Sequence, residues 1–425
     1  MCFLPLPLAP ADRLLNPRPV RQPTSMSSRK VRLKPPGKVR RRVPPKTDEF
    51  EILIRDLASD GRGVGEAPDG QVVFVAGVWL GELVRVRRTR QGATTDTLFL
   101  EVIEAHDHRV TPACTYHRQG QCGGCPWMFM GYEAQVSAKQ VKLASALVSL
   151  SATHLGCRVN GSVRQLGYRN RAQLKTNGRE LGYLGASSHD LADIETCAVL
   201  TDSNQMLLSR LRDSLPNSAW RPRSKQKWIT LDIDDQRDAP IIDKRQPFRQ
   251  ANDGQNAVMR DWLADKLAAL VPEGPVLELF CGNGNLTSVI AECNPHAQVV
   301  AVEGDEAALE ALATRNIASV TTERVNLFDD RQIRALISAL PSINGVVLDP
   351  PRDGLKARDA FGSVFSECSW VVYISCNLAT WQRDAQFLHD QGLRLTQVEG
   401  LDMFPQTPHL EVLSVFERQW QGGET

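Results

Sequence analysis

Hydrophobic and polar residues alternate along this chain in two distinct patterns. Between Phe50 and Ile103, short runs such as FEILI, VVFVAGV and TLFLEVIE alternate with a period of two and are separated by glycine-rich turns. From residue 274 onward, the apolar runs GPVLELF, QVVAVEG, NGVVLDP and SWVVYISC end in polar residues, and segments of helical period lie between them. The first pattern predicts a small all-β barrel, and the second predicts a doubly wound parallel sheet of the α/β class.

Four regions follow from these patterns. We expect an arm over residues 1–46, an OB-like barrel over 47–106, a central α+β region over 107–250 and a Rossmann-like domain over 251–425. The central region contains a predicted helix from Tyr132 to Ser149 and strands around Tyr168 to Thr176. In the last region, the segments Glu306 to Ile317 and Arg331 to Leu340 have helical period.

Positive charge is concentrated in the first region. The whole chain has 50 Lys plus Arg against 49 Asp plus Glu, but residues 1–46 hold twelve basic residues, one acidic residue and ten prolines. Such a segment buries too little apolar surface to order its backbone, so we expect a disordered basic arm. It serves either as a solvating tail or as a weak attraction for RNA. Met26 is an alternative start site.

Several features argue against a membrane or secreted protein. No apolar run reaches the roughly 18 residues that a membrane helix needs. The N-terminal MCFLPLPLAPADRLL contains three prolines and no basic residue ahead of its apolar run, unlike a signal peptide. Ten cysteines in 425 residues are too few for a disulfide scaffold. We therefore expect a soluble protein of the reducing cytoplasm, with a monomer as the default state.

Four of the cysteines indicate a metal site. Cys114, Cys122 and Cys125 form the motif C-x7-C-G-G-C, and Cys197 follows 72 positions after Cys125. Four thiolates suit either Zn²⁺ or a [4Fe-4S] cluster. Structural zinc sites usually have two paired C-x2-C units, so three local ligands and one distant ligand favour the iron–sulfur cluster over zinc.

The segment from Val276 to Asn285 is typical of a strand that runs into a glycine turn, after which Leu286 begins a helix. Such a turn lets a nucleoside cofactor approach bare backbone. Thr287 replaces the third glycine of the dinucleotide fingerprint, whereas Glu303 ends the second strand 21 residues after Gly282, where a carboxylate can bind both ribose hydroxyls. A ribose diol without a phosphate cradle favours S-adenosylmethionine over NAD. The alternative is a structural βα turn.

Three further segments carry candidate catalytic residues. Asp349 begins DPPRDG at a strand end, and Arg352 stands where amino-methylating enzymes place a stacking aromatic residue, which disfavours methylation of an exocyclic amine. Cys376 precedes a predicted helix from Asn377 to Gln391, and we expect the helix dipole to lower the pKa of this thiol and make it a nucleophile. Glu411 is a carboxylate at the junction between a loop and the strand VLSVFER.

Together these motifs resemble the RNA 5-methyluridine methyltransferases, most closely the bacterial enzymes that act on 23S rRNA. The resemblance covers about residues 47–418 and rests on CGGC, FRQAN, LELFCGNGNLT, VEG, LDPPRDG, ISCN and HLEVLSVF, which occur in the family's order. The barrel resembles the TRAM domain, a module that lends RNA affinity, through its DGRGVG turn and the stretch from Val75 to Glu82. The C-x7-C spacing is longer than the x5 form of the family.

The resemblance implies a methyltransferase domain that uses S-adenosylmethionine. It implies that a [4Fe-4S] cluster is bound by Cys114, Cys122, Cys125 and Cys197. It implies contacts with S-adenosylmethionine from Gln250, Phe280, Asn285, Glu303, Asn326 and Asp349. Cys376 matches the family's nucleophile, which adds to C6 of the uracil, and Glu411 matches the group that accepts the C5 proton.

The substrate implied is 23S rRNA, free or in an assembly intermediate, because the tRNA enzyme of the family lacks the cluster cysteines and the TRAM module. A tRNA 5-methyluridine methyltransferase is one alternative. An RNA 5-methylcytosine methyltransferase would need a cysteine beside the motif at Asp349, and none is there. A non-enzymatic iron–sulfur RNA-binding protein would not depend on Cys376. A radical S-adenosylmethionine enzyme would have C-x3-C-x2-C spacing, which this chain does not match.

Overall fold

The computed structural model describes residues 46–91, 94–185, 190–244, 246–270 and 274–419. From Lys46 onward these residues form one compact unit. The predicted basic arm lies outside the described residues, apart from Lys46 itself. No helix in the described part of the chain is long and apolar enough to cross a membrane.

The first described segment forms two three-stranded antiparallel sheets, ordered β1-β5-β6 and β2-β3-β4. The strands are β1 (Lys46–Leu53), β2 (Asp56–Leu57), β3 (Gly63–Glu66), β4 (Val72–Val75), β5 (Leu83–Gln91) and β6 (Thr94–Glu104). Alternate side chains point inward, so that Val73 and Val75 of β4 share one apolar core with Val84 and Val86 of β5. The predicted all-β character is confirmed, and the assignment to the TRAM domain stays a prediction.

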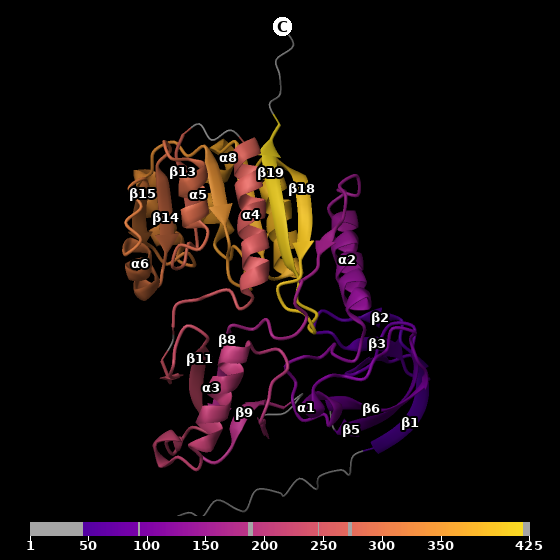
Figure 1. Ribbon diagram of the computed structural model, residues 1–425. Coiled ribbons are helices and arrows are strands. Elements are labelled where there is room, and N and C mark those ends of the chain that lie inside the picture. Colours follow the sequence, from indigo (N-terminus) through magenta and orange to yellow (C-terminus); the bar gives the residue numbers. More distant parts are fainter. Residues whose placement is uncertain (1–45, 92–93, 186–189, 245, 271–273, 420–425) are drawn as a thin grey trace, which may run out of the picture. The chain divides into compact units, whose positions relative to one another are not determined.

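The middle of the chain contains a five-stranded antiparallel sheet with the order β10-β9-β8-β11-β12. Its strands are β8 (Arg171–Thr176), β9 (Leu181–Leu184), β10 (Leu191–Asp193), β11 (Ile229–Asp234) and β12 (Ile241–Ile242). Helix α3 (Asp202–Asp213) packs on this sheet through Leu207, Leu208 and Leu211 (Figure 1). Two short helices, α1 (Thr115–Arg118) and η1 (Ser218–Trp220), complete the region.

The C-terminal part is built on an eight-stranded sheet with the order β15-β14-β13-β16-β17-β19-β18-β7 (Figure 1). Its strands are β7 (Val159–Asn160), β13 (Val276–Leu279), β14 (Val299–Glu303), β15 (Val320–Arg324), β16 (Gly345–Leu348), β17 (Trp370–Ser375), β18 (Leu393–Leu401) and β19 (Glu411–Arg418). The five strands from β15 to β17 are parallel, and β19 runs antiparallel to both β17 and β18. The predicted doubly wound sheet is confirmed. Its strand order reverses between β13 and β16, where such sheets bind ligands.

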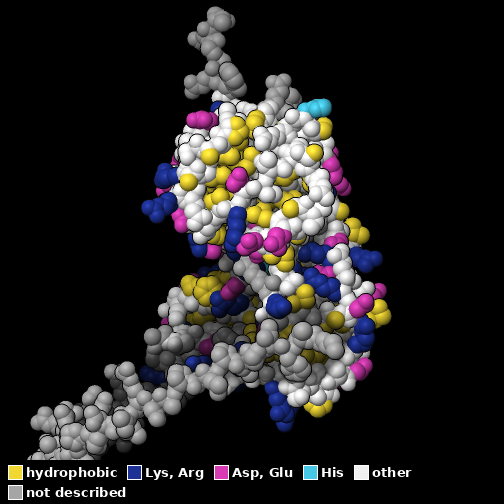
Figure 2. Space-filling view, turned by 90° about the vertical axis from the view of Figure 1, so that its left-hand side faces the viewer, with side chains coloured by type: hydrophobic (Ala, Val, Ile, Leu, Met, Phe, Trp, Pro, Cys, Tyr) yellow, Lys and Arg dark blue, Asp and Glu magenta, His cyan; other side chains and the backbone are white. Residues whose placement is uncertain are grey.

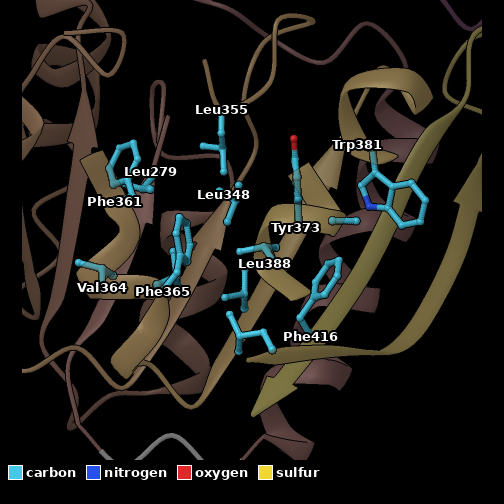
Figure 3. Close-up of a cluster of buried hydrophobic side chains, with 14 of the residues drawn as sticks. Leu279, Leu348, Leu355, Phe361, Val364, Phe365, Tyr373, Trp381, Leu388 and Phe416 are labelled. Atoms are coloured by element: carbon cyan, nitrogen blue, oxygen red, sulfur yellow. The ribbon is translucent and has the colours of Figure 1, made fainter. Parts of the chain in front are cut away.

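Helices cover both faces of this sheet. They are α4 (Asp253–Ala269), α5 (Thr287–Cys293), α6 (Glu306–Ala313), α7 (Asp330–Ala339), η2 (Arg358–Phe361), α8 (Gly362–Glu367) and α9 (Leu378–Asp390). Val276 and Val347 pack with α4 and α5 on one face, whereas Leu277 and Val346 pack with α7, α8 and α9 on the other. Successive residues of one strand therefore enter two different cores. Figure 3 shows part of the second core, in which Phe365 is one of several buried aromatic residues.

Helix α2 (Tyr132–Ser149) and strand β7 join this C-terminal sheet, although both belong to the predicted central region. β7 pairs in parallel with β18, with Val159 opposite Gly400, and Leu143 and Leu147 of α2 pack in the core of the sheet. The bounds of α2 are those predicted from the sequence. The two-residue strand has no periodicity of its own, so only its partner far along the chain defines it.

Candidate active site and cysteine cluster

The carboxyl ends of neighbouring parallel strands bring several predicted site residues together. β13 pairs in register with β14 on one side and with β16 on the other. Phe280, Glu303 and Asp349 stand at or just beyond the ends of these three strands, so they lie next to one another at one edge of the sheet. This is the edge at which a doubly wound sheet binds its ligand.

The glycine turn after β13 has an unusual backbone. Phe280, Gly282 and Gly284 have φ values of 62°, 55° and 88°, in the left-handed region that favours glycine. A Cβ atom on Gly284 would stand 2.5 Å from a methyl group of Leu312 in α6. The Gly282 N–H donates to Glu303 Oε2 at 3.2 Å. The turn is therefore folded tightly against the carboxylate predicted to bind a ribose.

Two residues outside the motif hold the end of this turn, and the sequence analysis did not identify either. The side-chain amides of Asn285 and Asn256 in α4 form two reciprocal hydrogen bonds of 2.8 and 3.0 Å. Arg260, one turn further along α4, donates to the Asn285 carbonyl and to Ser288 Oγ. A polar residue on the buried side of α4 is the only sequence signal that marks this partnership.

The two other predicted cofactor residues, Gln250 and Asn326, lie in segments outside the turn. Gln250 is buried in the segment that leads into α4, and its carbonyl accepts a hydrogen bond of 3.0 Å from Asn170. Asn326 follows β15, and its Cα would lie 3.8 Å from a Cβ atom on Gly304, directly after Glu303. The predicted positions at the ends of β13, β14 and β16 thus converge, whereas no described hydrogen bond links Gln250 or Asn326 to the turn.

Glu278 is a buried acid that the sequence analysis missed. It lies in the middle of β13, is 2% exposed, and has one carboxyl oxygen without a hydrogen-bond partner among the described residues. Burial raises the pKa of Glu278 to about 8, with a smaller contribution from Asp349. A single acidic residue within an otherwise apolar strand, VLEL, was the available signal.

Cys376 and Glu411 face each other across an antiparallel strand pair. Ser375 at the end of β17 pairs with Val412 of β19. Cys376 is the next residue beyond Ser375 and Glu411 is the residue before Val412, so the antiparallel register sets them opposite each other. Glu411 is 5% exposed and Cys376 is half-buried. The register of β17 and β19 thus brings the two predicted catalytic residues close together.

Burial and neighbouring charges shift the pKa values of this group. Burial raises the pKa of Glu411 to about 8, and the nearby Asp349 raises it further while Arg352 lowers it. Burial raises the pKa of Asp349 to about 7. Burial, Glu411 and Asp349 raise the pKa of Cys376 to about 12, and Arg352 opposes them. Perturbed acids of this kind are typical of catalytic sites.

The direction of the Cys376 shift corrects the expectation from the helix dipole. Asn377 is the N-cap of α9, and its side-chain oxygen accepts hydrogen bonds from the N–H groups of Ala379 and Thr380. Two of the backbone donors at this helix end are therefore already satisfied. Desolvation and two adjacent carboxyl groups outweigh the remaining dipole, so the thiol stays protonated at neutral pH in this state of the protein.

Arg352 is the cation of this site, and the side chains around it fix its position. Its guanidinium group lies 3.2 Å from Nε2 of His409. Asn377 and Thr380 donate hydrogen bonds of 3.1 and 3.2 Å to its carbonyl. Burial lowers the pKa of His409 to about 4, so this imidazole is neutral at pH 7 and can accept a hydrogen bond from the guanidinium.

The four predicted ligand cysteines line a single cavity of about 210 Å³. Cys114, Cys122 and Cys125 come from the segment around α1, and Cys197 comes from the loop before α3. Burial raises the pKa of Cys122, and the neighbouring thiols raise it further. Ionising several buried thiols so close together costs free energy, and binding a shared cation or cluster offsets this cost.

The donors around this cavity fit a negatively charged cluster. The N–H of Gly124 points at the sulfur of Cys122, and the N–H groups of Val199 and Leu200 point at the sulfur of Cys197. Arg169 also lines the cavity. Among the described residues, no group of three or more His, Cys, Asp or Glu side chains has the geometry of a bound metal ion.

Comparison with known proteins identifies relatives across most of the chain. A family model described as tRNA (Uracil-5-)-methyltransferase matches residues 222–419. An uncharacterized RNA methyltransferase of Nitrosomonas europaea is 34% identical over 384 residues, which cover 87% of this chain and 97% of that protein. The 23S rRNA (uracil(1939)-C(5))-methyltransferase RlmD of Halomonas elongata is 31% identical over 455 residues, which cover 88% of this chain and 92% of that protein.

A solved structure has the same fold. The tRNA (uracil-54, C5)-methyltransferase of Pyrococcus abyssi, in complex with S-adenosyl-L-homocysteine, superposes with a TM-score of 0.64. The match covers 86% of this chain and 100% of that chain at 19% sequence identity. At this identity the likeness concerns the fold.

Proposed function

Because the chain belongs to the RNA uracil-5-methyltransferase family, we propose that it methylates C5 of a specific uridine in 23S rRNA. The proposed nucleophile is Cys376, and Glu411 is the proposed acceptor of the C5 proton. The enzyme is proposed to act as a monomer in the cytoplasm. The RlmD relatives, which cover most of the chain, support the choice of rRNA.

The observation that carries this proposal is the register of β17 and β19. It sets a cysteine and a buried carboxyl group opposite each other, next to Asp349 and beside the glycine turn. Methylation of a pyrimidine carbon needs these two groups at one place, because one must add to the ring and the other must later remove a proton. A simple RNA-binding protein has no need for this pair.

The chemistry follows from the low nucleophilicity of uracil C5. The Cys376 sulfur forms a bond to C6 as the thiol loses its proton, and the electron pair of the C5–C6 double bond moves into the ring carbonyl system. Asp349, with a pKa of about 7, is a neighbour able to take the thiol proton. Arg352 favours the thiolate form of Cys376. S-adenosylmethionine, when bound, supplies the methyl group that C5 accepts.

Glu411 completes the reaction by removing the remaining C5 proton. Its carboxylate accepts that proton, the C5–C6 double bond forms again, and the bond between C6 and the Cys376 sulfur breaks. A carboxyl group with a pKa of about 8 is a stronger base than an exposed one. If Glu411 cannot accept the proton, the methylated RNA remains covalently bound to the protein.

The residues at the carboxyl edge of the sheet fit the cofactor that this reaction needs. The proposed contacts to S-adenosylmethionine come from Gln250, Phe280, Asn285, Glu303, Asn326 and Asp349. The left-handed backbone from Phe280 to Gly284 leaves main-chain atoms open to a nucleoside, and the carboxylate of Glu303 lies against this turn. Asn256 and Arg260 hold Asn285 in place.

The cysteine cavity is proposed to hold a [4Fe-4S] cluster through Cys114, Cys122, Cys125 and Cys197. Support comes from the convergence of four thiols on one cavity and from the N–H groups directed at two of the sulfurs. Such a cluster would link the segment around α1 to the loop before α3. Methyl transfer from S-adenosylmethionine involves no net oxidation or reduction, so we assign the cluster a structural and RNA-contacting role.

Exposed cations offer a surface for the RNA backbone. Arg221, Arg223, Lys225 and Lys227 follow one another between η1 and β11 with no acidic residue among them, and the half-buried Trp228 comes next. By contrast, Arg85 and Arg87 on β5 pair with acidic residues of the neighbouring strands. On the face shown in Figure 2, basic and acidic side chains are interspersed. We therefore propose that the run before β11 binds the RNA backbone, in addition to the RNA affinity that the resemblance to the TRAM domain implies for the barrel.

The test is a methyl-transfer assay on purified proteins. Wild type, Cys376→Ala and Cys157→Ala are incubated separately with unmodified 23S rRNA and with unmodified tRNA, in the presence of methyl-labelled S-adenosylmethionine. The labelled nucleoside is then identified after digestion. Cys157 is a matched control because it is half-buried like Cys376 and lies outside the site.

We expect labelled 5-methyluridine in rRNA from wild type and Cys157→Ala, and none from Cys376→Ala. Labelled 5-methylcytidine, or equal labelling by Cys376→Ala, would refute the proposed chemistry. Label that appears only in tRNA would keep the chemistry and replace the substrate. A wild type that binds RNA but transfers no label to either RNA would support a non-enzymatic role instead.

A further inference from the structure

The loop from Asp402 to Leu410 connects β18 to Glu411, so its conformation sets where the proposed base stands. The loop is almost entirely buried. Its polar groups form hydrogen bonds largely with residues that precede β8 in the sequence. Figure 1 shows α2 beside β18, the strand from which the loop leaves.

Gln406 is held at the middle of the loop by Gln135 of α2. The two side chains and the Gln406 backbone form a pair of hydrogen bonds, Gln135 Nε2 to Gln406 Oε1 and Gln406 N to Gln135 Oε1, each of 2.9 Å. The Trp127 N–H donates to the Gln406 carbonyl at 3.0 Å. Gln135 also donates to the carbonyls of Trp127 and Met130. One buried amide thus joins the loop to the turn that follows Cys125.

Tyr168 holds the position next to Gln406. Its hydroxyl donates to the Pro405 carbonyl at 3.1 Å, and the side chain is only 4% exposed. Its ring packs in a small cluster with Met128, Cys125 and Cys197. The same side chain therefore contacts the wall of the cysteine cavity and the loop that carries the proposed base.

An ion pair without solvent access fixes the start of the loop. Lys139 Nζ lies 2.6 Å from Asp402 Oδ1, and both side chains are 0% exposed. The hydroxyl of Tyr132 donates to the other carboxyl oxygen at 2.8 Å, and Gln255 donates to the Asp402 carbonyl at 2.9 Å. A fully bonded buried ion pair selects one geometry more strongly than it adds stability.

We propose that Tyr168 and Gln135 are positioning residues for Glu411. They hold the loop against the wall of the cysteine cavity. This fixes the Glu411 carboxyl group relative to the uracil ring that is bonded to Cys376. The inference rests on the proposed function. It assigns these side chains to the step that Glu411 performs, removal of the C5 proton, because Glu411 follows directly from the loop, while the backbone of Cys376 is held separately by β17 and α9.

The test separates formation of the covalent RNA adduct from its breakdown. Tyr168→Phe removes one hydrogen bond to the loop and keeps the ring. Tyr373→Phe (Tyr373 is labelled in Figure 3) is the contrasting variant, because its buried hydroxyl donates to Asp384 and so joins β17 to α9, the elements that hold Cys376, and does not contact the loop. In single-turnover reactions of the full-length holoprotein, gel electrophoresis under denaturing conditions counts methylated RNA in the adduct and as free product.

We expect Tyr168→Phe to slow adduct breakdown by about fivefold to tenfold, the range given by loss of one buried hydrogen bond. Adduct formation should stay within about twofold of wild type. Tyr373→Phe should leave the rate of adduct breakdown at the wild-type value, because it does not touch the loop that leads to Glu411. Hydrogen exchange of peptides that cover residues 402–411 should also become faster in Tyr168→Phe than in Tyr373→Phe.

Equal slowing of formation and breakdown, or identical behaviour of the two variants, would overturn the inference. A Glu411→Gln protein in the same assay distinguishes the two levels of the argument. If it forms no adduct and releases product normally, the proposed function fails. If it accumulates adduct while Tyr168→Phe resolves it at the wild-type rate, only the positioning role fails.

Discussion

Replacing Glu278 by Gln is expected to make the protein more stable at neutral pH. Glu278 lies inside β13, is 2% exposed, and has a carboxyl oxygen without a partner among the described residues. Burial raises its pKa from the ordinary value of 4.5 to about 8. The folded protein therefore keeps this carboxyl group protonated at pH 7, whereas the unfolded chain releases the proton. Gln has nearly the same shape and no proton to release.

The magnitude follows from proton linkage. Because the folded-state pKa is raised, the stability associated with the neutral carboxyl group is fully present below pH 4.5 and is lost as the pH rises to about 8. Each pH unit in this window costs about 1.4 kcal/mol of unfolding free energy, so about 3 kcal/mol is lost between pH 5 and pH 7. The Gln variant lacks this loss. Asp349 and Glu411 also titrate, but they are present in both proteins and largely cancel in the difference.

The assay is denaturant unfolding of wild type and Glu278→Gln at pH 5, 6 and 7, with Glu292→Gln as the control. Glu292 is an exposed carboxyl group on α5. We expect the stability of Glu278→Gln relative to wild type to rise by about 3 kcal/mol from pH 5 to pH 7, and the Glu292→Gln difference to stay flat. A difference for Glu278→Gln that does not change with pH would show that this acid is ionised in the folded protein and would refute the reasoning.

Three further predictions concern the site. The rate of adduct breakdown should rise about tenfold per pH unit below pH 8 and level off above it, because Glu411, with its pKa of about 8, must be ionised to accept a proton. A flat rate profile from pH 6 to pH 9 would exclude Glu411 as the proton acceptor. Gly284→Ala should weaken the binding of S-adenosylmethionine, measured by calorimetry, because the new Cβ atom would stand 2.5 Å from a leucine methyl group of α6. The control variant Gly70→Ala, at a similar φ of 81° and with open space around the Cβ position, should bind the cofactor normally. Cys125→Ser should lose the visible absorbance and bound iron of a reconstituted cluster, and Cys157→Ser should keep both; equal iron in the two would argue against the cluster.

Much of the site could be predicted because strand ends are visible in a sequence. Glu303, Asp349 and Cys376 each follow an apolar run of strand length, and the rule for parallel sheets brings such ends to one edge. The position of Glu411 was harder to predict, because its strand, β19, runs antiparallel to β17 and is not followed by a helix in the described part of the chain. Its place opposite Cys376 depends on a register that no local pattern records.

Other parts of the molecule could not be predicted for a similar reason. Asn256 and Asn285 form an amide pair between a helix and a turn, and neither residue stands out until the helix is docked. The predicted fall in the pKa of Cys376 was wrong because the helix end was treated alone. Asn377 satisfies two of the donors at that end, and the carboxyl groups of Asp349 and Glu411 come from other strands.

The buried ion pair of Lys139 and Asp402 has a consequence for the order in which the chain can fold. The two residues are 263 positions apart. A ribosome that adds about 5–20 residues per second needs roughly 13 to 53 s to synthesise that interval. Throughout this time Lys139 has no carboxylate to balance its charge, so α2 cannot dock in its final buried position. The docking of α2 must therefore wait for the last part of the chain, whereas the N-terminal β-sheets have an apolar core of their own and need not wait.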